Sequence, residues 1–320
     1  MKYDLLQELL TLNDEEKLVL QQKREVQKEL YTSQESFIVE GEKFLNNRMI
    51  MVRKHTRFVP FPKHKHNYIE VNYVYNGTLN QTVGNEKLEL KKGDILFLNQ
   101  YIEHELEACS EEDIIINFII KPEFFSFIFS YLTTENMISN FLISSIFNET
   151  QNGEYLYFAV SQIESIQELI EKMIIEIMKP SLLSESTIKL YMGLLMVELI
   201  KNSDKVRYNE ESHKHQTIVE SLKYIDENYK DATLYELAAN LNLPHYTLSK
   251  EIKKATKFTF KDLVQEKRLS VAKELLVNTS LPITSIVEEV GYENISYFYR
   301  VFKSKYGYTP KNYRDEILKK

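Results

Sequence analysis

The chain has 320 residues, of which 43% are hydrophobic and 27% are charged, a composition that fits a globular protein of two domains and excludes extensive disorder. No run reaches the roughly 20 apolar residues of a membrane-spanning helix, and no secretory signal is present, so we expect no membrane partner. A single cysteine, Cys109, excludes an internal disulfide framework. Together these features predict a cytoplasmic protein.

The net charge of -7 is distributed unevenly along the chain. From Ser212 to Lys320 there are 18 basic and 14 acidic residues, whereas the preceding part holds 22 basic and 33 acidic residues. Binding to phosphates needs a local excess of Lys and Arg. The C-terminal part is therefore where a nucleic-acid partner is expected.

Residues 1–48 alternate leucines with Glu, Lys and Gln. Leu5, Leu6, Leu9 and Leu10 form one group at helical spacing, and residues 18–20 form another. Apolar residues three and four positions apart are typical of amphipathic helices. We expect one or two such helices in this region.

Residues 49–121 contain short β-rich runs separated by turn residues. The runs are 49–52, 69–74, 79–83, 95–98 and 114–118, with Gly77, Gly84 and Gly93 in the turns. Short strands with regular turn signals predict a small antiparallel barrel or jelly roll.

Three histidines and a glutamate lie in this β-rich region. His64-x-His66-x3-Glu70-x6-Gly77 is followed by Gly93-x5-Asn99-x4-His104. These segments resemble the paired metal-binding motifs of cupin barrels, although Asn99 replaces the usual proline of the second. The resemblance implies that the three imidazoles and the carboxylate converge inside a barrel, as a set suited to divalent Fe, Mn, Ni or Zn.

Helical patterns return in residues 122–201. One stripe consists of Ile163, Ile166, Ile170, Met173 and Ile177, and a second of Ile188, Tyr191, Leu195 and Leu199. We expect both stripes to pack against the barrel, and part of this region is a candidate homodimer surface. Residues 202–216 are polar without periodicity, which predicts an interdomain linker.

Residues 217–320 contain a degenerate repeat of about 50 residues, each copy a helix, a tight turn and a second helix. Asn242 and Gly291 occupy matching turn positions, where a left-handed backbone costs least for Gly and Asn. The leading helices are predicted to bury Leu234, Leu237, Ala238 and Leu241 in the first copy, and Ile283, Ile286, Val287 and Val290 in the second.

Each turn precedes a candidate recognition helix, over residues 244–255 and 294–306. Leu248 and Ile252 face inward in the first, and Phe298 and Phe302 in the second. Outward side chains can bond base edges or phosphates. They are His245, Tyr246, Ser249, Lys250 and Lys253 in the first helix, and Ile295, Ser296, Tyr297, Arg300 and Lys303 in the second. Of these, Arg300 is the best candidate for a bidentate contact to guanine.

A continuous helical pattern from Phe260 to Val277 connects the two copies. Its 18 or so residues would span about 27 Å, close to the spacing of successive major grooves on one face of DNA. The pattern therefore predicts two recognition helices in neighbouring grooves.

The segment from Arg268 to Arg314 resembles the AraC/XylS family signature along its whole length. The matching run is Arg268-x3-Ala272-x2-Leu275-Leu276, then Ile286-x3-Val290-Gly291-Tyr292-x4-Tyr297-Phe298-x-Arg300-x-Phe302-Lys303-x3-Gly307-x2-Pro310-x2-Tyr313-Arg314. The first copy departs from the family pattern, because Ile252 replaces the usual Phe and Lys257 the usual Gly after the recognition helix.

The resemblance implies an α+β protein of two domains, with a cupin-like β-barrel and flanking helices followed by an all-α bipartite helix-turn-helix domain over residues 217–320. It implies a DNA-binding transcription regulator, more often an activator than a repressor. The implied partners are double-stranded promoter DNA, RNA polymerase, a second copy of the chain, and a small-molecule effector such as a sugar or related metabolite. The candidate effector-binding residues are His64, His66, Glu70, Tyr73, Asn99, Tyr101 and His104.

Two alternatives compete with a sensor barrel. A metal-dependent cupin enzyme or metal sensor would use His64, His66, Glu70 and His104 as ligands, and a purely structural barrel would bind nothing. Because the barrel is fused to a DNA-binding part, binding an effector without converting it is enough for function. We therefore expect no enzyme activity, no catalytic residue, no cofactor and no bound metal. The sequence contains no Walker motif, nucleophile elbow or dinucleotide-binding glycine pattern.

Overall fold

The computed structural model describes residues 5–21, 25–130, 136–147, 152–208 and 216–318. The chain divides into two compact units. Among the described residues, the first comprises 5–128 and 136–208, and the second comprises 129–130 and 216–318. Each unit has its own core, and each is described by itself.

The N-terminal region contributes both helices and a strand to the first unit. The predicted amphipathic helices are α1 (Leu5–Leu10) and α2 (Asp14–Gln21), and they are followed by η1 (Lys28–Leu30), β1 (Ile38–Val39) and α3 (Glu42–Leu45). Strand β1 pairs in parallel with β3 of the barrel. The region predicted as helical over residues 1–48 is therefore partly built into the sheet.

Two sheets form the barrel, with strand orders β1-β3-β8-β5-β6 and β11-β10-β7-β4-β9-β2. The strands are β2 (Ile50–Lys54), β3 (Phe61–His66), β4 (Ile69–Asn76), β5 (Thr78–Val83), β6 (Glu86–Lys91), β7 (Ile95–Leu98), β8 (His104–Leu106), β9 (Ile114–Ile120), β10 (Tyr155–Phe158) and β11 (Val206–Tyr208). Apart from β1 on β3, the pairings within the described residues are antiparallel. The predicted antiparallel barrel is confirmed.

The turn between β4 and β5 shows why a glycine stands there. Gly77 has φ +76°, and a Cβ at this position would lie 2.0 Å from Asp113 Oδ1. That carboxylate oxygen accepts the Thr78 N–H at 2.8 Å. A side chain at residue 77 would therefore displace the acceptor that closes the turn.

The barrel extends beyond the predicted range of 49–121. Strand β10 pairs with β7, and β11 pairs with β10 at the edge of the six-stranded sheet. Because β11 is an edge strand with mostly exposed side chains, it lacks the apolar alternation of a strand with a buried face, and residues 206–208 were predicted as linker. Residues 209–215 of that predicted linker lie outside the described part of the chain.

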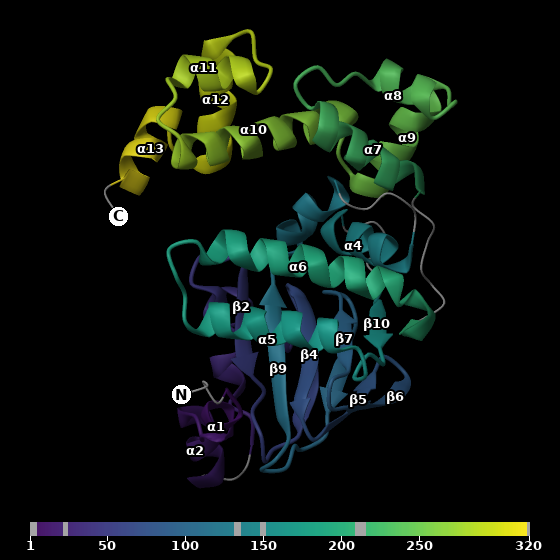
Figure 1. Ribbon diagram of the computed structural model, residues 1–320, viewed down its shortest axis with the longest axis vertical. Helices are drawn as coiled ribbons and strands as arrows, with labels where there is room; N and C mark the ends of the chain where they lie inside the picture. Colours follow the sequence, from purple (N-terminus) through teal and green to yellow (C-terminus); the bar gives the residue numbers. More distant parts are fainter. Residues whose placement is uncertain (1–4, 22–24, 131–135, 148–151, 209–215, 319–320) are drawn as a thin grey trace. The chain divides into compact units, whose positions relative to one another are not determined.

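Helices cover the outer face of the six-stranded sheet. They include η2 (Pro122–Ser130), α4 (Met137–Phe147), α5 (Glu164–Met178), α6 (Ser184–Lys201) and the short η3 (Ser203–Lys205). Figure 1 shows α5 and α6 side by side in front of β4, β7 and β9. Ile166, Ile170 and Met173 of α5 are buried, as are Ile188 and Leu195 of α6, so most of each predicted stripe lies in the core.

The described residues of the second unit form helices joined by turns and short loops. It consists of α7 (Gln216–Asn228), α8 (Leu234–Asn240), α9 (His245–Thr256), α10 (Phe260–Asn278), α11 (Ile283–Glu289), α12 (Ile295–Tyr306) and α13 (Pro310–Leu318). Figure 1 shows α10 as a long helix between the group of α7, α8 and α9 and the group of α11, α12 and α13. Leu269, Ala272 and Leu276 of α10 share a buried core with Phe298 and Phe302 of α12.

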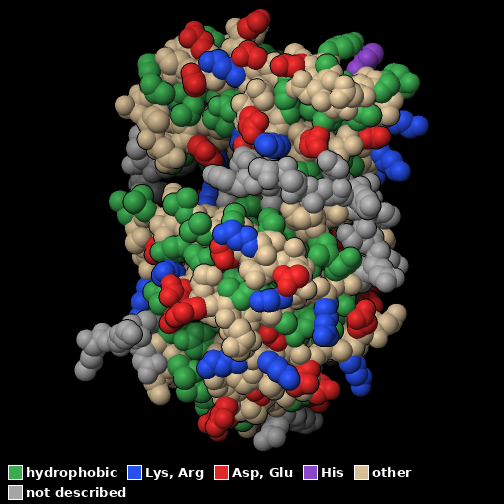
Figure 2. All heavy atoms as spheres, turned by 45° about the vertical axis from the view of Figure 1, so that its right-hand side comes forward, with side chains coloured by type: hydrophobic (Ala, Val, Ile, Leu, Met, Phe, Trp, Pro, Cys, Tyr) green, Lys and Arg blue, Asp and Glu red, His purple; other side chains and the backbone are tan. Residues whose placement is uncertain are grey.

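The surface of the described residues carries mixed charges. Basic and acidic side chains are interspersed over both units on the face drawn in Figure 2. No helix among the described residues is long and apolar enough to cross a membrane. On the face drawn in Figure 2, basic side chains are therefore not gathered into one uniformly basic patch.

Candidate nucleic-acid interface and candidate effector site

Helices α8 and α9 form the first helix-turn-helix motif. Thr233 caps α8, with its hydroxyl oxygen accepting the Glu236 N–H at 3.2 Å. Asn242 makes the turn with φ +52°. Leu248 and Ile252 of α9 are fully buried, so the opposite side of this helix faces solvent, as predicted.

Helices α11 and α12 repeat this arrangement. Gly291 makes the turn with φ +80°, and Asn294 Oδ1 accepts the Tyr297 N–H at 2.9 Å to cap α12. Phe298 and Phe302 are fully buried. Both turns use the left-handed backbone that the sequence predicts for Asn and Gly.

The outward face of α9 is open to solvent. His245, Lys250 and Lys253 are exposed, Ser249 is half-buried, and 70% of Tyr246 is accessible. Tyr235 of α8, equally exposed, was missed by the sequence analysis because the leading helix was examined only for core residues. Its ring centroid lies 4.6 Å from that of His245, so the aromatic surface of the motif extends onto α8.

The outward face of α12 differs from the prediction at one residue. Ile295, Ser296, Arg300 and Lys303 are exposed, whereas Tyr297 is half-buried. The Tyr297 hydroxyl donates to Gln265 Oε1 of α10 at 2.9 Å, and the Arg300 guanidinium carbon lies 5.2 Å from the Tyr297 ring centroid. Tyr297 therefore supports Arg300 while its own hydroxyl is already bonded within the protein.

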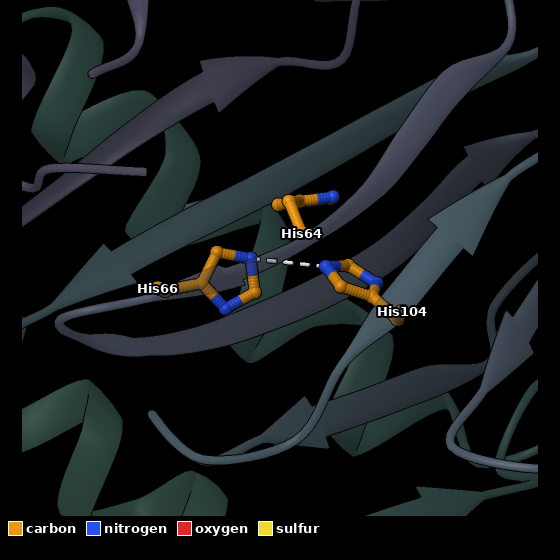
Figure 3. Close-up of side chains that lie close together, drawn as sticks. All are labelled: His64, His66 and His104. Carbon is orange, nitrogen blue, oxygen red and sulfur yellow. Dashed lines mark hydrogen bonds between the residues drawn. The ribbon is translucent and has the colours of Figure 1, made fainter. Parts of the chain in front are cut away.

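Three histidines meet inside the barrel (Figure 3). His64 and His66 come from β3 and His104 from β8, and His64 and His104 are direct partners in the strand pairing. The Nε2 atoms of His66 and His104 are 3.0 Å apart. Glu70 Oε2 of β4 lies 3.3 Å from His66 Nε2 and 3.6 Å from His104 Nε2. The structure thus brings together the four side chains that the sequence placed inside the barrel.

A chain of buried amides links Glu70 to His104. Asn117 Nδ2 donates to Glu70 Oε1 at 2.9 Å, and Asn72 Nδ2 donates to Asn117 Oδ1 at 3.1 Å. Gln81 Nε2 donates to Asn72 Oδ1 at 3.2 Å, and Gln81 Oε1 lies 2.9 Å from His104 Nδ1. Because an ionised carboxylate only accepts, Glu70 sets the direction of every bond in this chain.

The bonds at Nδ1 determine where the lone pair lies in two of the histidines. Gln81 Oε1 accepts a proton from His104 Nδ1, and the Pro62 carbonyl, 2.8 Å from His64 Nδ1, does the same for His64. In both rings the lone pair is therefore on Nε2. These two Nε2 atoms can bind a cation or accept a hydrogen bond from a ligand.

Burial and charge set the protonation of the cluster. Burial lowers the pKa of His64 to about 3 and holds the pKa of His104 well below its usual value, because the interior disfavours a charged ring. Burial alone would raise the pKa of Glu70, but the interactions with His66 and His64 outweigh it and lower this pKa to about 2. The cluster holds an ionised carboxylate beside neutral His64 and His104.

A small cavity adjoins this cluster. It is lined by His64 and Glu70 together with Arg53, His55 and residues of the N-terminal region. The cavity volume open to the centre of a water molecule is about 20 Å³, which is enough for roughly one water. Arg53, His55 and the amide chain were not among the predicted site residues, because strand register decides which side chains meet across the sheet.

Of the seven predicted effector residues, His64 and Glu70 line this cavity, and the other five do not: His66, Tyr73, Asn99, Tyr101 and His104. Asn99 Oδ1 accepts the N–H groups of Tyr101, Ile102 and Glu154 at 3.1, 3.2 and 3.0 Å, so Asn99 and Tyr101 belong to a loop junction. Tyr73 alternates to the outer face of β4, where its hydroxyl donates to Gln167 Oε1 of α5 at 2.6 Å. Effector binding by Tyr73, Asn99 and Tyr101 stays a prediction, which rests on residue type and not on the direction of each side chain.

Comparison with known proteins places both units. A model described as a cupin domain matches residues 55–120, and a model described as a helix-turn-helix domain matches residues 237–316. The regulatory protein PocR of Salmonella typhimurium is 36% identical over 98 residues, 30% of this chain and 32% of PocR. The HTH-type transcriptional activator RhaS of Mannheimia succiniciproducens is 25% identical over 255 residues, 79% of this chain and 89% of RhaS.

Among solved structures, the C-terminal domain of AraT, a response regulator from Geobacillus stearothermophilus, is 35% identical, with a TM-score of 0.30, over 31% of this chain and 84% of that domain. The matched part of this chain spans about a third of PocR and most of RhaS. A cupin domain followed by a helix-turn-helix domain of this kind defines a class of regulators. The chain belongs to the AraC/XylS family of DNA-binding transcription regulators, which confirms the family resemblance and the predicted fold class.

Proposed function

We propose that the protein controls transcription by placing α9 and α12 in successive major grooves of double-stranded promoter DNA. The observation that carries this proposal is the pair of matched motifs, each presenting an exposed polar and basic helix face. The connecting helix α10 has 19 residues and is about 28 Å long, near the roughly 34 Å of one turn of DNA. Its length therefore suits two contacts on one face of the duplex.

In this proposal Arg300 reads a base of the second half-element. Its guanidinium is exposed and rests on the Tyr297 ring, so the two-donor edge is free for guanine. Lys303 neutralises a phosphate, and Ile295 and Ser296 contact the groove beside Arg300. In the first motif, His245, Tyr246, Ser249, Lys250 and Lys253 take the corresponding roles, and the added Tyr235 orients His245.

Replacement of Arg300 tests this assignment. Arg300→Ala should weaken binding to the selected promoter by about 1–3 kcal/mol and relax specificity at one base position. Lys303→Ala should weaken binding to all sequences alike and reduce the salt dependence. Lys172→Ala, an exposed change on α5 of the other unit, is the control. Unchanged promoter affinity in Arg300→Ala would remove Arg300 from the base-reading set.

The barrel senses a small molecule in this account, with a sugar or related metabolite as the leading class. Polar side chains around the cavity support an effector role. A sugar is much larger than the cavity, so its binding requires the wall formed by Tyr31 and Val39 of the N-terminal region to move. A metabolite screen by thermal shift tests this, because a ligand that binds only the folded barrel raises its unfolding temperature.

A metal ion is a second candidate effector, and the geometry of the histidine cluster favours it. The distances of 3.0, 3.3 and 3.6 Å between His66 Nε2, His104 Nε2 and Glu70 Oε2 match those between neighbouring ligands bonded at about 2.1 Å to one ion. The bond from His104 Nδ1 to Gln81 is of the kind that orients metal-binding histidines. His64, His66, His104 and Glu70 would hold the ion, which would supply positive charge as a regulatory signal, or Lewis acidity in a cupin enzyme.

Metal analysis separates the two candidates. Protein purified without chelator, or loaded with Zn²⁺ or Mn²⁺, should bind one ion per chain if the metal reading is right, and His66→Ala and His104→Ala should abolish this binding. Tyr101→Ala, in the loop beyond the cavity, is the control. Absence of binding in the wild type leaves the organic effector as the remaining candidate.

The proposed regulator acts in the cytoplasm as a homodimer that recruits RNA polymerase, and the activator RhaS supports an activating role. A dimer surface is available on α6. Leu183, Leu190, Leu194 and Val197 are exposed and recur at steps of seven, four and three residues, as in the seam of a two-stranded coiled coil. This stripe lies opposite the buried residues of α6.

A further inference from the structure

The turn between α7 and α8 lies against the turn of the second helix-turn-helix motif, beside α10. The chain leaving α7 presents the carbonyl oxygens of Tyr229 and Lys230, which Arg268 of α10 binds through Nε at 2.8 Å and Nη2 at 2.7 Å. The Arg268 guanidinium carbon also lies 5.5 Å from the ring centroid of Tyr292, in the turn of the second motif. One side chain therefore links the turn between α7 and α8 to the turn of the second motif.

The turn of the second motif approaches the same carbonyl. A Cβ placed on Gly291 would lie 2.4 Å from the Lys230 oxygen, a distance that no side chain tolerates. The backbone of the α7–α8 turn is thus in close contact with the turn of the second motif, and an ion pair between Lys230 and Glu289 at 3.6 Å lies beside them. Glycine at residue 291 serves this contact as well as the left-handed turn.

The turn of α10 that carries Arg268 is tied to both sides. Lys267 is bonded to Asp226 of α7. On the other side, Gln265 accepts from Tyr297 of α12 at 2.9 Å, and Glu266 is bonded to Lys305 of the same helix. Consecutive residues 265–268 therefore hold α7 and α12 in fixed positions relative to α10.

We propose that Arg268 is a positioning residue that fixes the separation of α9 and α12, so that the protein measures the distance between its two half-elements. Arg268 Nε and Nη2 donate to backbone carbonyls, and the flat face of the guanidinium lies against the Tyr292 ring. Arg268 therefore acts by positioning the recognition helices and not by touching DNA. The inference rests on the bipartite contact proposed above. Because the two motifs already have a fixed arrangement, DNA binding does not have to order one motif relative to the other, and the free-energy cost of that ordering is avoided.

Rigidity makes a specific prediction about operator spacing. Each added base pair moves the second half-element by about 3.4 Å along the duplex and rotates it by about 34°. A DNA-binding unit of fixed geometry cannot follow this change. A unit whose two motifs move relative to each other can bind the second half-element over a range of positions. The ratio of affinities for the preferred and the lengthened spacing therefore reports the function of Arg268.

The experiment uses full-length protein and three kinds of duplex: both half-elements at the selected spacing, the same lengthened by one base pair, and a single half-element. Wild-type protein should strongly prefer the selected spacing. Arg268→Ala should bind that duplex about 10- to 100-fold more weakly, the change expected for losing charge-assisted hydrogen bonds. Its affinity for the single half-element should stay unchanged, and its spacing preference should collapse.

Three further variants complete the test. Arg268→Lys keeps a donor and should restore part of the spacing preference. Gly291→Ala presses on the Lys230 carbonyl from the opposite side and should also relax the preference. Ser270→Ala, exposed two residues along α10, should behave as wild type. A merely unstable fold would reduce binding to every duplex in proportion and would leave the ratio unchanged.

Two results would overturn the inference, and they are distinguishable. If the wild type prefers one spacing and both Arg268→Ala and Gly291→Ala keep the same preference, the positioning role is refuted while the bipartite contact stands. If the wild type binds all spacings equally, the bipartite contact fails and the positioning role fails with it.

Discussion

Lys257 occupies a backbone conformation that suits glycine. It follows α9 with φ +62°, whereas the matching residue after α12 is Gly307 with φ +78°. A non-glycine residue in the left-handed region costs about 1–2 kcal/mol. The family pattern of glycine after the first recognition helix is therefore explained by backbone geometry, and this chain carries strain there.

Relief of that strain is measurable. Lys257→Gly should raise the free energy of unfolding of the second unit by about 0.5–1 kcal/mol, because the removed strain exceeds the added chain entropy of glycine. Gly307→Ala, where an added Cβ meets no atom within 4 Å, should lower it by a similar amount through φ alone. Scanning calorimetry of both variants checks the pair, and a destabilised Lys257→Gly would show that position 257 is unstrained.

Glu16 attaches α2 to the barrel through buried charges. Its carboxylate accepts from Arg57 Nε at 2.7 Å and Nη2 at 3.1 Å, and Lys54 Nζ lies 2.7 Å away. Burial raises the pKa of Glu16, but the hydrogen bonds from Arg57 and Lys54 outweigh it and lower this pKa below its usual value. The folded state therefore favours the ionised form of this group.

This shift makes the stability of the first unit depend on acidity. Because the folded pKa lies below the unfolded one, the stabilisation is fully present above about pH 4.3, the usual pKa of glutamate, and is lost as the pH falls through the folded value. Glu16→Gln should cost about 3–5 kcal/mol at neutral pH, since it leaves Arg57 buried without its partner. Urea unfolding at several pH values should show the variant and wild type converging in acid. Asp14→Asn, at an exposed ion pair, should change little; a difference for Glu16→Gln that persists in acid would contradict the account.

The histidine cluster shows how far residue-level prediction from sequence reaches. The spacing of His64, His66 and Glu70 places them on one side of neighbouring strands, and this part of the prediction is realised in the structure. Asn72 and Gln81 were missed because nothing in a single strand reveals that an amide on one strand faces an amide on the next. Their role depends on strand register, which local patterns do not encode.

At the scale of elements, strands with a strong apolar alternation or an apolar run were predicted, and polar strands were not. β4, β7 and β9 were found from sequence because both of their faces are covered. β3 reads Phe-Pro-Lys-His-Lys-His and β11 reads Val-Arg-Tyr, so neither contains an apolar run. Such strands form because their neighbours offer backbone partners, which is a tertiary effect.

Helix α6 carries two apolar stripes, and the sequence analysis identified only the buried one. Leu190 and Leu194 belong to the exposed stripe. If this stripe is the dimer surface, Leu190→Glu with Leu194→Glu should convert dimers to monomers without unfolding the first unit, because neither residue is part of its core. Glu185→Ala, exposed at a position off the stripe, should remain dimeric. Sedimentation would count against this surface if the double variant stayed dimeric or if the wild type were monomeric.

At the scale of the whole molecule, the order of the two domains follows from sequence because each carries its own dense motif. The helix-turn-helix repeat has fixed turn chemistry at Asn242 and Gly291, and the barrel has regularly spaced turn glycines. The identity of the effector does not follow, because a cavity of about one water is assembled from distant strands and the N-terminal region. Function was therefore predictable at the level of class and not of ligand.

The measurement that tests the central claim most directly is selection of bound fragments from genomic DNA at physiological salt, with wild-type protein, Tyr246→Ala and Arg300→Ala. We predict a motif of two half-elements about one helical turn apart, with Tyr246→Ala losing information in one half-element and Arg300→Ala in the other. Enrichment of a single undivided element, or loss of the same positions in both variants, would contradict reading by two separate helices.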